Sequence, residues 1–181
     1  MVRIIIGPMG SGKSEQILSD INYIKKLGDK VVCFKPKQDT RAKDEIKSRN
    51  GMSHKAIEVE NLLQMYNIMK ELHFKGIRHF VCDEIQFFRT EELKMLMEFI
   101  HSRDIVFIAS GLNQTSEMEP FLPTAKFAMY ADEIIVKTGE CVYCGGKSKR
   151  TICKVDKKDT VLVGDDIYEA TCYACGSIKM Y

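Results

Sequence analysis

A chain of 181 residues, 45% hydrophobic and 29% charged, is long enough for one domain with a buried core and a small additional module. Its formal net charge of +2 is too close to neutral to indicate a nucleic-acid or membrane-surface partner. No apolar run approaches the roughly 20 residues that span a bilayer, and the first apolar run is too short for a secretory signal, so we expect a cytoplasmic protein.

The first apolar run, residues 2–6, predicts a strand that leads directly into a glycine-rich turn. This turn, Gly7 to Ser14, reads GPMGSGKS and matches the G-x-x-x-x-G-K-S pattern of a phosphate-binding loop. In such loops backbone N–H groups surround a phosphate, the lysine reaches the terminal phosphates and the last hydroxyl binds Mg²⁺. We predict phosphate contacts from Gly7, Gly10, Ser11, Gly12, Lys13 and Ser14. The alternative interpretation is a turn that only joins a strand to a helix.

Beyond this loop, amphipathic helices alternate with short apolar strands as far as residue 137. Apolar side chains that recur every three or four residues predict the helices, and short apolar runs predict the strands. The predicted helices are residues 14–27, 62–74 and 91–101. The predicted strands are residues 30–35, 56–59, 79–82, 104–110 and 133–137. This alternation predicts an α/β fold with a mostly parallel sheet flanked by helices.

Two segments between these elements read as irregular. Residues 38–54 are polar with little periodicity, which predicts a mobile surface segment that is either functional or disordered. Residues 111–124 contain two prolines and are predicted to form a loop. We therefore expect no regular structure from either segment.

Two adjacent carboxylates follow the predicted strand at residues 79–82. The carboxyl ends of parallel strands are where ligands bind, and Asp83 is expected there to hold Mg²⁺ against the phosphates. Glu84 comes next, and because the strand is ending, both carboxylates can face one cleft. A glutamate in that place can accept a proton from an attacking hydroxyl. The alternative for Glu84 is a solvated charge at the end of a strand.

The sequence changes character near residue 138, where paired cysteines replace the alternating pattern. Of seven cysteines, four form two C-x-x-C pairs, which suit a tetrahedral Zn²⁺ site. These four are Cys141, Cys144, Cys172 and Cys175. A redox role would need only one such pair, and without an export signal we expect reduced thiols. We predict a P-loop domain at residues 1–137, with Cys33 and Cys82 in its core, and a small zinc-ribbon-like domain at residues 138–181.

In this order and spacing the motifs resemble those of the class II thymidine kinases from end to end. The matching segments are GPMGSGKS (7–14), KP and DTR (35–36 and 39–41), SRNG (48–51), DEIQFF (83–88), GLN and PF (111–113 and 120–121) and VGDDIY (163–168). The resemblance implies a RecA-like P-loop domain and a small zinc domain with a substrate-covering "lasso" loop. It also implies ATP-dependent phosphorylation of the thymidine 5′-hydroxyl to dTMP, for salvage of DNA precursors, with deoxyuridine as a candidate second substrate.

The resemblance further implies a role for each matching residue. Glu84 corresponds to the general base, Arg41 to an arginine beside the transferring phosphate, and Asp83 to the support for Mg²⁺. Lys13 and Ser14 keep the roles given above, now toward ATP. The positions around base and sugar are Met9, Phe87, Leu112, Phe121, Thr151 and Tyr168, and the lasso positions expected to contact the pyrimidine are Val161, Val163 and Gly164. Relatives form tetramers or dimers that dTTP inhibits, so we expect a homotetramer with dTTP as feedback inhibitor.

Four positions depart from the family pattern: Asn113, Ser116, Cys153 and Asp165. Ser116 stands where many members have an aromatic residue that stacks on the base, so the substrate follows less directly than the reaction type.

Two other function classes remain open from the sequence. One is a nucleic-acid-stimulated ATPase, because the run Asp83 to Gln86 is similar to the DExx box of helicases. The other is a non-catalytic zinc-ribbon protein that binds nucleotides. A single lobe and a near-neutral charge disfavour the first, and the intact Lys13 and Glu84 disfavour the second.

Overall fold

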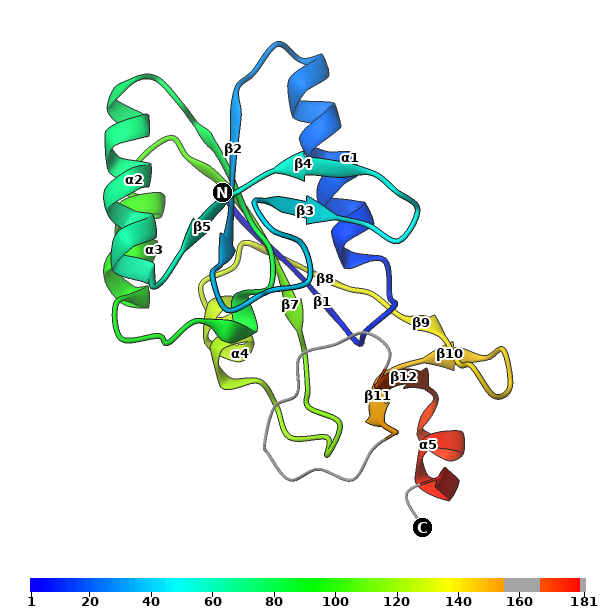
Figure 1. Cartoon of the computed structure of the whole chain (residues 1–181). Coiled ribbons are helices and arrows are strands. Elements are labelled where there is room, and N and C mark those ends of the chain that lie inside the picture. Colours follow the sequence, from blue (N-terminus) through cyan, green and yellow to red (C-terminus); the bar gives the residue numbers. More distant parts are fainter. Residues whose placement is uncertain (155–166, 180–181) are drawn as a thin grey trace.

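The computed structural model describes residues 1–154 and 167–179, and its centre is a six-stranded parallel sheet (Figure 1). The strands of this sheet are β1 (Val2–Gly7), β2 (Val31–Pro36), β5 (Ile57–Val59), β6 (His79–Cys82), β7 (Val106–Leu112) and β8 (Glu133–Val136). They lie in the order β5-β2-β6-β7-β1-β8, and every neighbouring pair is parallel. The predicted α/β fold with a parallel sheet is confirmed.

Helices cover both faces of this sheet. They are α1 (Lys13–Lys26), α2 (Leu62–Phe74), α3 (Leu93–His101) and α4 (Leu122–Ala128). In Figure 1, α2 and α3 lie together on one side of the sheet and α1 lies on the other. Because successive strand side chains point to opposite faces, Ile4 packs in the core under α2 and α3, whereas Ile5 packs against α1. Strands covered on both faces are apolar almost throughout, which is the pattern that the sequence shows.

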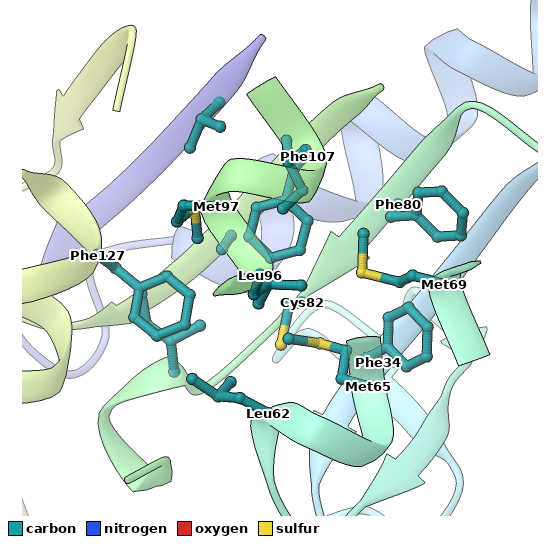
Figure 2. Packing of buried hydrophobic residues seen from close by; sticks show 14 of the residues in the cluster. Phe34, Leu62, Met65, Met69, Phe80, Cys82, Leu96, Met97, Phe107 and Phe127 are labelled. Carbon is teal, nitrogen blue, oxygen red and sulfur yellow. The ribbon is translucent and has the colours of Figure 1, made fainter. Parts of the chain in front are cut away.

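The larger core lies between the sheet and the helices α2, α3 and α4 (Figure 2). Four fully buried phenylalanines meet there from different elements: Phe34, Phe80, Phe107 and Phe127. Cys82 lies in this core and Cys33 in the smaller one, which confirms both as core residues. Burial raises the pKa of Cys33 to about 12, so its thiol stays protonated and unreactive at neutral pH.

The segment predicted as irregular between β2 and β5 contains a hairpin. Its strands are β3 (Glu45–Lys47) and β4 (Ser53–Lys55), which pair antiparallel. Ile46 points inward, is 2% exposed and belongs to the core that α1 builds with Ile17 and Ile21. Strands of three residues are too short to show an alternating hydrophobic pattern in the sequence. The hairpin is stabilised by its contact with α1, which the sequence did not predict.

Two further elements differ from the predictions. Helix α4 begins inside the predicted loop, with Pro123 in its first turn, a position where proline is favoured because its missing N–H has no partner there anyway. After β8 the chain forms the pairs β9 (Gly139–Glu140) with β10 (Lys147–Ser148) and β11 (Arg150–Cys153) with β12 (Tyr168–Thr171). A short helix that was not predicted, α5 (Tyr173–Lys179), follows β12.

A search of the described residues for helices that are both long and apolar enough to cross a membrane finds none.

Candidate active site

The phosphate-binding loop runs from the end of β1 into the first turn of α1. Gly10 and Gly12 have φ angles of 70° and 76°, in the left-handed region that glycine adopts without strain. At Gly7 the constraint is space, because a Cβ there would lie 2.6 Å from the carbonyl oxygen of Lys137. The path of this loop therefore requires glycine at all three positions.

Lys13 is folded back onto the loop that precedes it. Its Nζ donates to the carbonyl oxygens of Gly7 at 3.0 Å and Pro8 at 2.8 Å. Burial lowers the pKa of Lys13, while the negative charges of Glu84 and Asp83 act in the opposite direction. The ammonium group is thus held inside the loop, within reach of a phosphate that the loop would bind.

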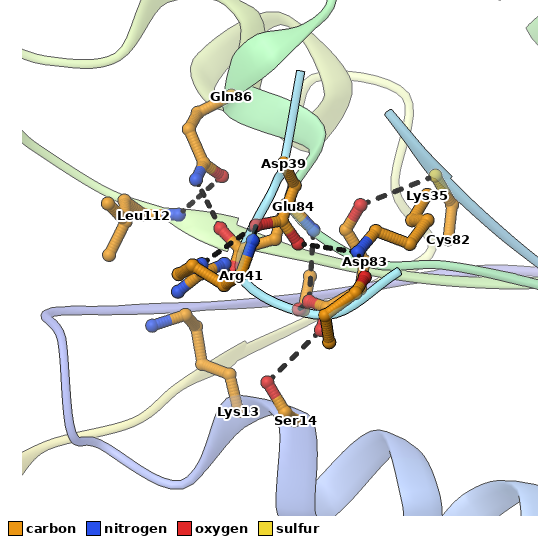
Figure 3. Close-up of polar contacts among 12 residues, drawn as sticks. Lys13, Ser14, Lys35, Asp39, Arg41, Cys82, Asp83, Glu84, Gln86 and Leu112 are labelled. Atoms are coloured by element: carbon orange, nitrogen blue, oxygen red, sulfur yellow. Dashed lines mark hydrogen bonds and ion pairs between the residues drawn. The ribbon is translucent and has the colours of Figure 1, made fainter. Parts of the chain in front are cut away.

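Asp83, which directly follows β6, connects the loop to the neighbouring strand (Figure 3). Its Oδ2 accepts a hydrogen bond from Ser14 Oγ at 3.1 Å, and its Oδ1 accepts from the Ser110 hydroxyl on β7 and from the Glu84 N–H at 2.9 Å. Burial and then repulsion from Glu84 raise the pKa of Asp83 to about 6. A carboxylate beside a loop hydroxyl is an oxygen donor set of the kind that Mg²⁺ takes.

Replacing Asp83 by asparagine is expected to stabilise the protein when no nucleotide or magnesium is bound. A carboxyl group whose pKa rises on folding lowers the free energy of unfolding at any pH where it is ionised. For Asp83 this loss is absent below about pH 4, grows between about pH 4 and pH 6, and is complete above about pH 6. A shift of about two units corresponds to at most about 3 kcal/mol. Urea unfolding at pH 7.5 should give a higher midpoint for Asp83→Asn than for wild type, with a smaller difference at pH 5. An equal or lower midpoint at pH 7.5 contradicts this expectation.

Glu84 adopts a left-handed backbone conformation, with φ 57° and ψ 42°, which is uncommon outside glycine and often marks a functional site. This turn takes the chain from β6 into the short 3₁₀ helix η1 (Ile85–Phe87). Both carboxylate oxygens are engaged, since Oε1 pairs with Arg41 and Oε2 accepts from the side-chain amide of Gln86. Glu84 is 6% exposed, and these two contacts hold its carboxylate in one orientation at the edge of the sheet.

Gln86 is a buried residue of this site, and the sequence indicated it only as part of the DEIQFF segment. Its Oε1 accepts the backbone N–H of Leu112 at 3.1 Å, which leaves Nε2 as the donor to Glu84. Since a carbonyl oxygen can only accept, these two contacts fix the orientation of the amide. In the sequence, only its position two residues after Glu84 indicated a role in the site. Its contact with Leu112 on β7 cannot be predicted from the sequence.

Arg41 lies at the end of a chain of alternating charges. Its Nε is 2.8 Å from Asp39 Oδ1, and Asp39 Oδ2 is 3.2 Å from Nζ of the buried Lys35. Burial would raise the pKa of Asp39, but the hydrogen bond and charge of Arg41, together with Lys35, lower it. The ionised Asp39 therefore holds the guanidinium against Glu84.

These groups line two adjoining cavities of about 180 and 250 Å³. The larger is bounded by residues 9–15 together with Arg41, Glu84 and Leu112. The predicted catalytic residues thus surround one space, and Met9 and Leu112 of the predicted nucleoside set lie with them. Thr151 is also close, because its hydroxyl accepts the Met9 N–H at 3.0 Å.

The rest of the predicted nucleoside set is not brought to these cavities. Phe87 on η1, Phe121 before α4 and Tyr168 on β12 are half-buried, and none of them is among the residues that line these two cavities. The predicted lasso contacts Val161, Val163 and Gly164 lie outside the described residues.

The four paired cysteines meet in the C-terminal part of the chain. The sulfur atoms of Cys141, Cys144, Cys172 and Cys175 all lie within 4.8 Å of one another. The Sγ atoms of Cys144 and Cys172 are 3.9 Å apart, and a tetrahedral Zn²⁺ with Zn–S bonds of about 2.3 Å needs separations near 3.8 Å. The cluster is consistent with a structural zinc site.

A parallel sheet with a phosphate-binding loop after β1 and a carboxylate pair after β6 defines the P-loop class of nucleotide-binding proteins. The thymidine kinase family model matches residues 1–176. Among curated relatives, a thymidine kinase of Ureaplasma urealyticum is 33% identical over 94% of this chain and 80% of its own length. A thymidine kinase of Metamycoplasma arthritidis is 33% identical over 97% of this chain and 89% of its own length. One of Mesomycoplasma hyopneumoniae is 31% identical over 98% of this chain and 96% of its own length.

The chain belongs to the thymidine kinase family. Membership over nearly the whole chain assigns it a phosphotransferase activity, the phosphorylation of thymidine for salvage.

Proposed function

We propose that Glu84 is the general base that takes the proton of the thymidine 5′-hydroxyl as its oxygen attacks the γ-phosphoryl group of ATP. The observation that carries this proposal is that Glu84 lines the same cavity as the phosphate-binding loop. A primary hydroxyl is a very weak acid, so the base accepts its proton late, while positioning and charge stabilisation lower most of the barrier.

The two contacts of Glu84 suggest how the base is kept ready. Arg41 pairs with one oxygen and Gln86 donates to the other, and each carboxylate oxygen has a second lone pair that can accept from a hydroxyl. We infer that Arg41, which lines the same cavity as the phosphate-binding loop, contacts the transferring phosphate from beside Glu84 while Gln86 holds Oε2. Arg41 then stabilises negative charge on the phosphoryl group.

For ATP, Lys13 would contact the β- and γ-phosphates and the loop N–H groups would surround them. Ser14 and Asp83 would hold Mg²⁺, which neutralises charge on these phosphates when bound. Their oxygen atoms, 3.1 Å apart, support this role. At the nucleoside end we propose Met9, Leu112 and Thr151 as contacts, from their places around the cavity and the loop.

We propose structural Zn²⁺ in the four-cysteine cluster and a domain boundary between residues 137 and 138. The end of β8 at Val136 and the start of the short hairpins at Gly139 support this boundary. From the resemblance alone we infer a cytoplasmic homotetramer that dTTP inhibits, which gel filtration and inhibition assays would test.

A substrate screen tests the acceptor. Purified protein is given ATP, Mg²⁺ and one of thymidine, deoxyuridine, deoxycytidine or a purine deoxynucleoside. We expect the highest rate with thymidine, a lower rate with deoxyuridine, and none with the purines. A preference for deoxycytidine or for a purine would overturn the proposed acceptor, and Ser116, which lacks the family's stacking ring, would then be the first position to examine.

Replacing Gln86 by methionine is expected to lower kcat by roughly tenfold to a hundredfold with little change in either KM. Methionine has a similar length but neither donates to Glu84 nor accepts from Leu112, so the base loses its orientation. Gln86→Glu keeps an acceptor for Leu112 but places a second carboxylate beside Glu84, and should not restore kcat. Steady-state kinetics separate this role from a structural one, which would appear as lower thermal stability at unchanged kcat.

A further inference from the structure

The hairpin of β3 and β4 carries a second arginine to the phosphate-binding loop. The hairpin lies beside α1 in Figure 1, and Arg49 is in its turn. A Cβ built on Gly10 would lie 3.1 Å from Arg49 Nη1 and 3.8 Å from its Cζ. Arg49 also lines both cavities together with Ser14 and Glu84. The guanidinium therefore lies over the outer side of the loop.

The turn that carries Arg49 is held from both sides. The Ser48 N–H donates to the carbonyl oxygen of Met52 at 2.9 Å, which closes the turn. The Asn50 side chain donates to Glu15 Oε1 at 2.8 Å, on the first turn of α1. Together with the buried Ile46, these contacts fix the backbone of Arg49 relative to the loop.

Arg49 differs from Arg41 in what surrounds its charge. Arg41 is paired with Asp39 and Glu84, whereas Arg49 has no hydrogen-bond or ion-pair partner within the described part of the chain. Burial is the main cause that lowers the pKa of Lys13, and the positive charges of Arg41 and Arg49 add to it. A cation that faces Lys13 without an anion of its own favours an anionic ligand in the space between them.

We infer that Arg49 binds the terminal phosphates of ATP and that the SRNG segment delivers it. This inference rests on the proposed function, in which the loop holds ATP. A guanidinium donates two parallel hydrogen bonds to a phosphate, which a lysine cannot reproduce. Lys13 reaches the phosphates from inside the loop and Arg49 from the hairpin over Gly10, while Arg41 remains on the side of Glu84. The triphosphate is thus enclosed between loop and hairpin.

The test compares nucleotide affinity, which requires no turnover. Calorimetry with a non-hydrolysable ATP analogue and with AMP is carried out on wild type, Arg49→Ala and Arg49→Lys. We expect Arg49→Ala to raise the Kd of the ATP analogue about tenfold to a hundredfold and that of AMP less than about twofold, because AMP lacks the terminal phosphates. Arg49→Lys should fall between wild type and Arg49→Ala, and the KM for thymidine should stay within about twofold.

The matched control is Lys55→Ala, which removes the same charge from the same hairpin at an exposed residue that lines neither cavity. It should leave the Kd of the ATP analogue within about twofold. Asn50→Ala should weaken binding less than Arg49→Ala and add nothing to it in the double variant, because both act through one contact.

The inference is overturned if Arg49→Ala binds the ATP analogue like wild type, if Lys55→Ala weakens binding equally, or if AMP loses as much affinity as ATP. Additive losses in the double variant with Asn50→Ala would also overturn the delivery by the hairpin. Failure of the proposed function appears separately, as a wild-type protein that forms no dTMP.

Discussion

Replacing Glu84 by glutamine is expected to lower kcat for thymidine phosphorylation by about a hundredfold to ten-thousandfold, the range that a general base contributes. Glutamine has the same shape, and its one carbonyl oxygen can still accept from Arg41 or from Gln86, so one of the two contacts that hold this side chain survives. It cannot take a proton from the 5′-hydroxyl. The measurement is the initial rate of dTMP formation, with the affinity for an ATP analogue determined on the same preparation.

The matched control is Glu45→Gln, because Glu45 on β3 lines the smaller cavity without following β6. This variant removes one negative charge from the same site and should keep kcat within about threefold. Near-normal turnover by Glu84→Gln, or an equal loss in Glu45→Gln, would show that Glu84 is not the base.

Replacing Cys172 by serine is expected to abolish zinc binding and to raise the KM for thymidine at least about tenfold. A structural Zn²⁺ supplies on the order of 10 kcal/mol of folding free energy, so the short hairpins around the cluster cannot keep their arrangement without it. Affinity for the ATP analogue should survive, because the cores of the parallel sheet are built from other residues. Zinc per chain, measured by atomic absorption, and the two KM values check this expectation.

Cys153→Ser is the control for the cysteine variant, because Cys153 lies on β11 outside the cluster. It should keep one zinc per chain and an ordinary KM for thymidine. A Cys172→Ser protein that retains full zinc content, or that loses ATP binding as severely as thymidine binding, would contradict the role given to the cluster.

The parts of the site that depend on short, local patterns could be predicted from the sequence. The phosphate-binding loop needs glycine where the backbone turns left-handed, and Asp83 and Glu84 follow directly on a strand, so one stretch of chain reveals each of them. The cysteine pairs are local in the same way. The parallel sheet followed from the alternation of helices and strands.

The parts that depend on contacts between distant segments could not be predicted. Ile46 stabilises its three-residue strand because α1 covers it. The orientation of the Gln86 amide is set by the N–H of Leu112, which lies on another strand. Arg49 belongs to the SRNG segment that matches the family, but the sequence gives its side chain no role, which appears only where the hairpin brings it to Gly10. In these three cases the role of the residue depends on a contact between segments that are distant in the sequence, which local propensity does not predict.

The most direct test of the central claim is the transfer of label from ATP carrying ³²P in its γ-phosphate, by purified protein with Mg²⁺ and thymidine. A site in which Glu84 faces the phosphate-binding loop should give one labelled dTMP for each ADP, with the label on the 5′-oxygen. ADP formation without dTMP, whether as slow hydrolysis or under stimulation by single-stranded DNA, would contradict it.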